Sequence, residues 1–152
     1  MSNSSNKEHI LQLNSYWPYQ ITVLADRIAR RTSKIVKEKG LNLSQWRVLA
    51  AIAEVPGRTS VEVVAITPMD KGIVSRATKA LLQLGYIRRK ASQVDGRISH
   101  LHLTKKGVAL YQSLIPDVES ILTRLDGSLS TKEQEALCRS LEILMSVIPD
   151  LR

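Results

Sequence analysis

The stretch MDKGIVSRATKALLQL, residues 69–84, constrains the fold of this chain more than any other segment. At about 100° per residue, its apolar side chains fall on one arc of a helix. That arc holds Ile73, Val74, Ala77, Ala80, Leu81 and Leu84. The opposite arc holds Lys71, Gly72, Ser75, Arg76, Thr78, Lys79, Leu82 and Gln83. A solvated helix face normally mixes acids with bases, but this face has no acid from Lys71 onward, so we expect it to meet a negatively charged partner.

The spacing of apolar side chains changes from a helical to a strand-like period directly after this helix. Gly85 is expected to end the helix, and residues 86–91 and 97–103 alternate in the manner of strands, with residues 92–96 as the loop between them. Two helices and a short helix are expected before residue 69, and two further helices after the hairpin. This order predicts a mainly α fold, a winged helix-turn-helix core with a two-stranded β-hairpin wing, in which residues 69–84 enter the major groove of DNA.

Side chains that cap helices mark most of the expected helix starts. Ser44 and Thr104 stand just before apolar-periodic segments as single N-caps. TSVE at 59–62 and STKE at 130–133 have the spacing of a capping box, in which the first and fourth side chains each cap the other's backbone. Pro116 lies inside the helix that follows the hairpin, and we expect that helix to bend or break there.

The expected helices at both ends of the chain carry more apolar surface than a small central module can cover. A second copy of the chain is therefore the expected partner. On this interpretation residues 1–40 and 108–152 form a helical dimerisation region with long N- and C-terminal helices. Residues 41–107 form the winged helix-turn-helix DNA-binding domain.

Positive charge is concentrated in one part of the chain. The sequence has 22 Lys plus Arg and 14 Asp plus Glu, a formal net charge of +8. Between Asp70 and Lys106, nine bases and two acids give +7, so the rest of the chain contributes only +1. A concentrated positive field suits a polyanionic partner, and nucleic acid is the common one.

The sequence further predicts a cytoplasmic protein without a cofactor. Its single cysteine, Cys138, excludes an intramolecular disulfide. No apolar run reaches the length of a transmembrane helix, and the polar start MSNSSNKEH is unlike a secretory signal, so no membrane partner is expected. We find no Gly-rich phosphate loop, nucleophile elbow or zinc hydrolase signature, and do not expect an enzyme.

Three segments together resemble the MarR family of winged-helix transcriptional regulators. They are LSQWRVLAAIAE at 43–54, MDKGIVSRATKALLQLGYIRR at 69–89 and VDGRISHLHLTKKG at 94–107. The resemblance extends over residues 20–148, and the spacing of particular residues carries it: Gly85 after the recognition helix, Asp95-x-Arg97 in the wing, and Leu103-Thr104-x-x-Gly107 after the wing. In one departure, Gly96 stands where the family commonly has an Arg.

This resemblance implies a homodimer that binds a pseudo-palindromic operator in double-stranded DNA and acts as a ligand-responsive repressor. It also implies a small aromatic or anionic effector, for which we assign no residues. The alternative is a winged-helix module for protein–protein contact without DNA specificity. The acid-free face of residues 71–83 argues against that alternative.

The candidate DNA contacts lie on the recognition helix and in the wing. The helix supplies Lys71, Gly72, Ser75, Arg76 and Lys79. Lys71 and Gly72 fall in its first turn, where backbone N–H groups favour phosphate. Arg76 can donate twice to a guanine, although an intramolecular salt bridge is its alternative role. Arg97 resembles the family residue that enters an A·T-rich minor groove, and Asp95 is expected to brace it. Arg88, Arg89 and Lys90 are phosphate candidates as a group.

Three further features have alternative interpretations. His100 and His102 share a strand face and could supply two metal ligands, but no third ligand lies near them in the sequence, so we expect no metal site. Cys138 is expected to be a small buried hydrophobe rather than a redox sensor. The aromatic cluster before the first long helix is expected to pack at the dimer interface rather than bind an effector. It comprises Tyr16, Trp17 and Tyr19.

Overall fold

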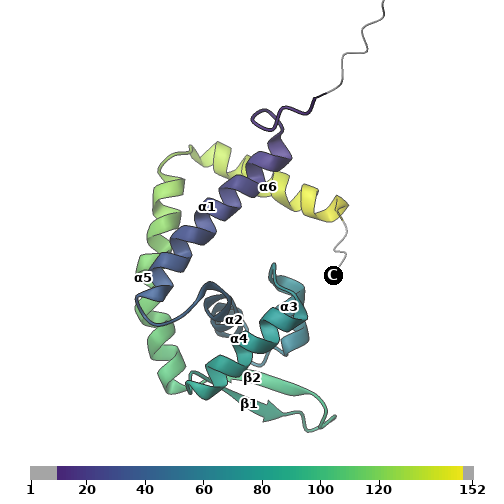
Figure 1. Ribbon diagram of the computed structural model, residues 1–152, viewed down its shortest axis with the longest axis vertical. Helices are drawn as coiled ribbons and strands as arrows, with labels where there is room; N and C mark the ends of the chain where they lie inside the picture. Colours follow the sequence, from purple (N-terminus) through teal and green to yellow (C-terminus); the bar gives the residue numbers. More distant parts are fainter. Residues whose placement is uncertain (1–9, 149–152) are drawn as a thin grey trace, which may run out of the picture.

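The computed structural model describes residues 10–148, which form six helices and one two-stranded antiparallel sheet (Figure 1). The elements are α1 (Trp17–Lys37), α2 (Leu43–Glu54), α3 (Ser60–Ile66), α4 (Lys71–Gln83), β1 (Ile87–Ala91), β2 (Ser99–Leu103), α5 (Lys105–Asp126) and α6 (Thr131–Val147). The predicted mainly α fold with a two-stranded wing is confirmed. The polar N-terminal segment up to residue 9 and the last four residues of the expected dimerisation region lie outside the described residues.

Both predicted capping boxes are confirmed. The Thr59 hydroxyl accepts a hydrogen bond from the Glu62 N–H, and the Glu62 carboxylate accepts one from the Thr59 N–H at 2.7 Å. Ser130 and Glu133 repeat this exchange at the start of α6. Each box satisfies two of the backbone donors that a helix start leaves without intrahelical partners. Thr104 caps α5 as expected, because its hydroxyl accepts from the Gly107 N–H.

The prediction that Ser44 caps α2 is wrong. Asn42 is the N-cap, and its side chain accepts from the Gln45 N–H at 2.8 Å. The Gln45 side chain accepts from the Asn42 N–H at 2.9 Å in return. Only Asn42 has a glutamine three residues later, so it gains a reciprocal pair that Ser44 cannot form.

Gly85 ends α4 as predicted, and its φ of +73° is one that glycine adopts without strain. Of the bend or break predicted at Pro116, the break does not occur, because α5 runs through this residue from Lys105 to Asp126. Proline inside a helix costs about 3 kcal/mol. Leu114 and Ile121 are buried on either side of it, and their packing offsets this cost.

The hydrophobic core is assembled around α2, with contributions from α1, α3, α4, α5 and both strands. Its largest fully buried side chains are Leu49, Ile52, Leu81, Leu101 and Leu114. Trp46 of α2 stacks on Tyr111 of α5, with ring centroids 5.6 Å apart and planes 14° from parallel. This stack fixes the first half of α5 against the winged core.

For two residues, Thr78 of α4 and Leu84 at its C-cap, the exposure is the reverse of what the helical periodicity predicted. Thr78 is 0% exposed, whereas the apolar Leu84 is 43% exposed. The reason is that α4 contacts α2, α3 and β1. The buried arc of α4 is therefore wider than its apolar stripe and includes Thr78.

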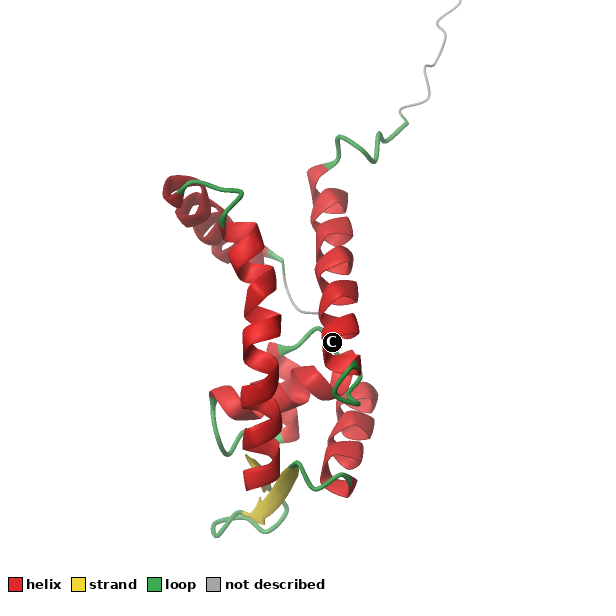
Figure 2. Ribbon diagram, turned by 90° about the vertical axis from the view of Figure 1, so that its left-hand side faces the viewer, coloured by secondary structure: helices red, strands yellow, loops and turns green. Residues whose placement is uncertain are grey.

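The terminal helices extend away from this core (Figure 2), and Figure 1 shows α6 at the end of the molecule opposite to the wing. No residue of α6 is buried. Its exposed apolar side chains are Leu137, Leu141, Ile143, Met145 and Val147. Cys138 is exposed, so its predicted burial is wrong. Within residues 10–148, no helix combines the length and apolar character needed to cross a bilayer.

The wing is joined to the segment before α3 by backbone hydrogen bonds. The Gly57 N–H donates to the Leu101 carbonyl at 2.9 Å, and the Leu101 N–H donates to the Arg58 carbonyl at 3.0 Å. Residues 57–58 thus pair with β2 on the side away from β1. This pairing holds the start of α3 beside the wing.

Candidate nucleic-acid interface

The first turn of α4 is exposed and held by an N-cap. The Asp70 carboxylate accepts a hydrogen bond from the Ile73 N–H at 2.7 Å. Lys71 and Gly72 follow directly and are both exposed. A Cβ atom added to Gly72 would lie 3.3 Å from the Asp70 carboxylate and 3.4 Å from the Arg76 guanidinium. Glycine therefore leaves this turn open to close approach from outside.

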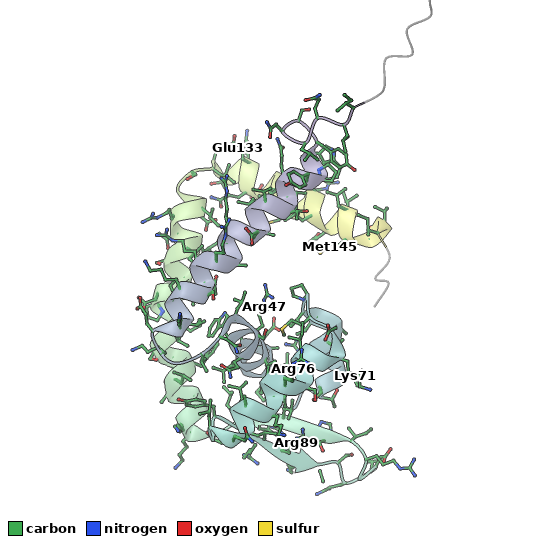
Figure 3. All side chains as sticks on the ribbon, viewed as in Figure 1. Arg47, Lys71, Arg76, Arg89, Glu133 and Met145 are labelled. Carbon is green, nitrogen blue, oxygen red and sulfur yellow. The ribbon has the colours of Figure 1, made fainter. Side chains whose placement is uncertain are left out.

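Ser75, Arg76 and Lys79 are exposed on the same helix, as the sequence predicts. Figure 3 shows Lys71 and Arg76 on α4 and Arg89 on the adjoining wing. In the described part of the chain, the only ion pairs are Asp26–Arg30 and Glu54–Arg58. The structure therefore does not contain the salt bridge that was the alternative role for Arg76, and its five guanidinium donors are available to an external partner.

A hollow of about 250 Å³ connects α4 to the wing. It lies between α3, α4 and β1, and it brings Lys71 and Ser75 together with Arg89. The other lining residues are Ser60, Val61, Val64 and Val74. The site thus combines an apolar floor with a basic and hydroxylic rim.

A second hollow continues from the first toward the wing loop. It is lined by Thr59, Ser60, Val61, Arg89, Arg97, Ile98 and Ser99. Because Ser60, Val61 and Arg89 line both hollows, the surface from the first turn of α4 to Arg97 is continuous. We call this the basic groove face. Sequence reasoning missed Ser60 and Val61, whose one available signal was their position inside the Thr59–Glu62 capping box.

Asp95 holds the backbone of the wing loop. Its carboxylate accepts a hydrogen bond from the Arg97 N–H at 2.9 Å, and it forms no ion pair with the Arg97 guanidinium. The Ser92 hydroxyl accepts from the N–H groups of Val94 and Asp95. Asp95 therefore positions residue 97 through the main chain and leaves the side chain of Arg97 uncompensated.

The acids near the basic groove face are occupied by backbone hydrogen bonds. The Asp70 and Asp95 carboxylates each accept a backbone N–H. The Thr59 backbone N–H, with a further contribution from the Thr59 hydroxyl, lowers the pKa of Glu62 below its usual value. These local bonds hold the carboxylates at helix and loop starts, so none of them forms an ion pair with Lys71, Arg76, Arg89 or Arg97.

His100 and His102 line a hollow that is separate from the two hollows of the basic groove face. His100 Nδ1 is 2.8 Å from the Gly57 carbonyl oxygen, so His100 helps to join the wing to the α2–α3 connection. Burial lowers the pKa of His102, with smaller contributions from Arg88, Lys90 and His100. Within residues 10–148, no three His, Cys, Asp or Glu side chains are grouped as metal ligands would be.

A sequence model described as the MarR family matches residues 39–98, which include α2, α3, α4 and most of the wing. The transcriptional regulator BilQ of Clostridium symbiosum is 27% identical over 94 residues, which are 62% of this chain and 65% of BilQ, just under two thirds of that relative. The transcriptional repressor MprA of Escherichia coli is 25% identical over 130 residues, covering 80% of this chain and 74% of MprA.

Solved structures share the whole architecture. A MarR-family regulator from Silicibacter pomeroyi superposes with a TM-score of 0.81 at 23% identity, covering 95% of this chain and 100% of its own. A mutant MarR from Escherichia coli in complex with operator DNA gives 0.72 at 22% identity, with coverage of 87% and 93%. BpsR of Bordetella bronchiseptica, described with the regulation of its DNA binding by 6-hydroxynicotinic acid, gives 0.79 at 21% identity, with coverage of 93% and 100%. The matched winged core, the regulator relatives and the shared fold make this chain similar to the MarR family of winged-helix transcriptional regulators.

Proposed function

We propose that the protein is a sequence-specific DNA-binding repressor that acts as a homodimer and responds to a small effector. One observation carries the DNA-binding part. The outer face of α4 is exposed, has no acid after Asp70, and continues through Arg89 to Arg97 without an internal ion pair. A surface with this much uncompensated positive charge suits the phosphate backbone of a duplex. Such a regulator works beside the chromosome, so we propose a cytoplasmic location.

In this proposal α4 lies in the major groove. Arg76 donates twice to guanine O6 and N7, which discriminates against other bases by about 1–3 kcal/mol. Ser75 reaches a base edge or a phosphate. Lys71, Gly72 and Lys79 contact phosphates and set the register of the helix on the duplex. Arg97, positioned by Asp95 through the wing backbone, enters the adjoining minor groove.

We further propose that residues 1–40 and 108–152 form the dimerisation region and residues 41–107 the DNA-binding domain. The support for dimerisation is a set of large apolar side chains that residues 10–148 leave exposed. Met145 is 70% exposed and Val147 is 68% exposed on α6, and Leu24 of α1 is 50% exposed. Several large apolar side chains left exposed along one helix, as on α6, are typical of an interface. A two-fold dimer would present two α4 helices to successive major grooves, about one helical turn apart.

The proposed effector site is a hollow between α1 and α2, lined by Ile28, Leu43, Trp46 and Arg47 among others. Within residues 10–148, no hydrogen bond or ion pair engages the Arg47 guanidinium. An aromatic wall with one free cation suits a small aromatic carboxylate. An effector bound between α1 and the winged core would change the separation of the two α4 helices. The dimer could then no longer bind both half-sites of the operator at once.

The test of DNA binding is fluorescence anisotropy with a random-sequence duplex at 50 and 200 mM salt. A protein that neutralises 6–10 phosphates loses on the order of 10³–10⁵ in affinity between these concentrations. Absence of binding at the lower salt would support the alternative, a winged-helix module for protein–protein contact. A transcription assay on the selected operator then decides whether the bound protein represses.

Oligomeric state is tested separately by analytical ultracentrifugation. Met145→Asp places a charge in the proposed interface, and we expect it to shift the protein toward monomer. Val94→Asp is the matched control, because Val94 is 99% exposed in the wing loop, and we expect that variant to remain a dimer. A wild-type protein that sediments as a monomer at micromolar concentration would contradict the proposed dimer.

Effector binding is tested by calorimetric titration with benzoate and 6-hydroxynicotinate. We expect the wild-type protein to bind at least one of them and Arg47→Ala to bind it at least tenfold more weakly. Arg139→Ala, on the distant α6, is the control. Equal binding by Arg47→Ala and the wild-type protein would exclude the α1–α2 hollow as the site.

A further inference from the structure

One apolar side chain stands exposed in the middle of the basic groove face. Val61, the second residue of α3, is 76% exposed although it lines both hollows of that face. Core packing does not explain this valine, because so little of it is covered. A valine at a solvated helix position also has a lower helix propensity than alanine, so local helix stability does not explain it either.

The surroundings of Val61 form an apolar recess with a polar rim. Val64 and Val74 line the same hollow, and Val74 is 1% exposed, so the hollow reaches down to the core. The rim is supplied by Lys71, Ser75 and Arg89. The rim is positively charged and the interior of the recess is aliphatic. A matching ligand carries negative charge beside a small apolar group.

The major groove of DNA offers that combination. The C5-methyl group of thymine is the apolar group on base-pair edges there, and phosphates flank it on both strands. We propose that Val61, backed by Val64 and Val74, reads the C5-methyl group of one thymine in each half-site, while Lys71 and Arg89 contact the adjoining phosphates. This inference rests on the proposed DNA-binding function and adds a specificity-determining contact from α3 to the contacts made by α4.

The contact has a definite expected size. Burying one methyl group changes an affinity by about fourfold at 25 °C. Loss of the methyl group should therefore weaken binding by about fourfold at a single position of the half-site. Removing the Val61 side chain should make the protein indifferent to that methyl group, while recognition at the other positions is retained.

The experiment uses duplexes that the full-length protein itself enriches from a random library. Each thymine of the enriched sequence is replaced in turn by deoxyuridine, which lacks only the C5-methyl group, and affinities are measured by anisotropy. We expect one position per half-site to lose about fourfold with the wild-type protein and to show no loss with Val61→Ala. Val108→Ala is the matched control, since Val108 is exposed on α5, and it should keep the fourfold dependence.

The outcomes separate this inference from the function on which it rests. Enrichment of a sequence whose affinity is unchanged by deoxyuridine at every position overturns the role of Val61 and leaves sequence-specific binding intact. The same conclusion follows if Val61→Ala retains the methyl dependence, with thermal melting used to show that the variant is folded. Failure to enrich any sequence overturns the proposed function, and the methyl contact with it.

Discussion

Gly107 of α5 lies so close to the backbone of Tyr86 that a Cβ atom at residue 107 would be 1.9 Å from the Tyr86 carbonyl oxygen. The same oxygen accepts the Thr104 N–H at 3.0 Å, and the Thr104 hydroxyl donates to the Gly85 carbonyl at 2.6 Å. Lys106 also donates to the Leu84 carbonyl at 2.9 Å. The end of α4, the proposed recognition helix, is therefore attached directly to the start of α5, the long helix that leads to the proposed dimerisation region.

Gly107→Ala should destabilise the protein by about 3 kcal/mol, because the backbone of α5 must move and the hydrogen bonds at Tyr86 must lengthen. Chemical denaturation measures this loss. Gly96→Ala is the control, since no atom lies within 4 Å of a Cβ added there, and its unfolding free energy should stay within about 0.5 kcal/mol of the wild-type value. Equal stability of both variants would mean that α5 does not approach Tyr86 as closely as described.

Thr78→Val should stabilise the protein by about 1 kcal/mol. Thr78 is fully buried, and within the described residues its hydroxyl has no hydrogen-bond partner. A buried hydroxyl without a partner carries a desolvation cost that a methyl group of similar size does not. We expect a rise in the melting temperature of about 2–4 °C for a chain of this length. A fall in stability would show that the hydroxyl has a partner in solution.

Arg76→Ala should weaken binding to the selected operator far more than binding to random duplex. A lost bidentate contact to guanine costs about 1–3 kcal/mol and relaxes specificity at one base pair. Lys79→Ala is the comparison, because loss of a phosphate contact weakens binding to all sequences and lowers the salt slope by about one. Competition binding at two salt concentrations measures both effects. Equal losses on operator and random DNA would argue against base recognition by Arg76.

Arg97→Ala should weaken binding most at operators flanked by A·T base pairs, where a narrow minor groove attracts the guanidinium. Affinities for A·T- and G·C-flanked operators give the measurement. Asp95→Ala should have a similar effect, since the Asp95 carboxylate holds the Arg97 backbone N–H, whereas Asp95→Asn keeps an acceptor oxygen and should bind nearly normally. A loss independent of the flanks would contradict a minor-groove role.

The stability of the protein should fall as pH drops below about 6.5. The pKa of His102 is lowered from its ordinary value of 6.5, mainly by burial, so the unfolded chain takes up a proton before the folded chain does. The contribution of neutral His102 to the free energy of unfolding is complete above pH 6.5, and it is lost as the pH falls from 6.5 toward the lowered pKa of the folded state. Denaturation at pH 7.5 and 5.5 should show a smaller difference for His102→Gln than for the wild-type protein. An unchanged pH dependence in this variant would assign the effect to another group.

The carboxylates contribute in a lower pH range. Hydrogen bonds at the capping boxes lower the pKa values of Glu62 and Glu133 below 4.5, so the stability they provide is lost only as pH falls below that value. Glu133→Gln is therefore the control for the histidine experiment. This variant should leave the difference between pH 7.5 and 5.5 unchanged.

The sequence by itself determined the features that depend on neighbours a few residues apart. Both capping boxes, the glycine that ends α4 and the change from helix to hairpin are local, because their hydrogen bonds and side-chain periods span at most one helical turn or one strand. The exposed basic and hydroxylic residues of α4 followed from the same periodicity. Lys71, Arg76 and Lys79 are exposed as that pattern predicts.

Only the tertiary structure decided which side chains are buried by neighbouring elements and which residues far apart in the sequence lie close together. Thr78 is buried because α4 packs against three other elements, whereas Cys138 is exposed because the described part of the chain buries no residue of α6. Val61 and Arg97 line one hollow because residues 57–58 pair with β2 and carry α3 to the wing. Burial and long-range pairing depend on the joint packing of segments far apart in the chain, and no periodicity within one segment contains that information.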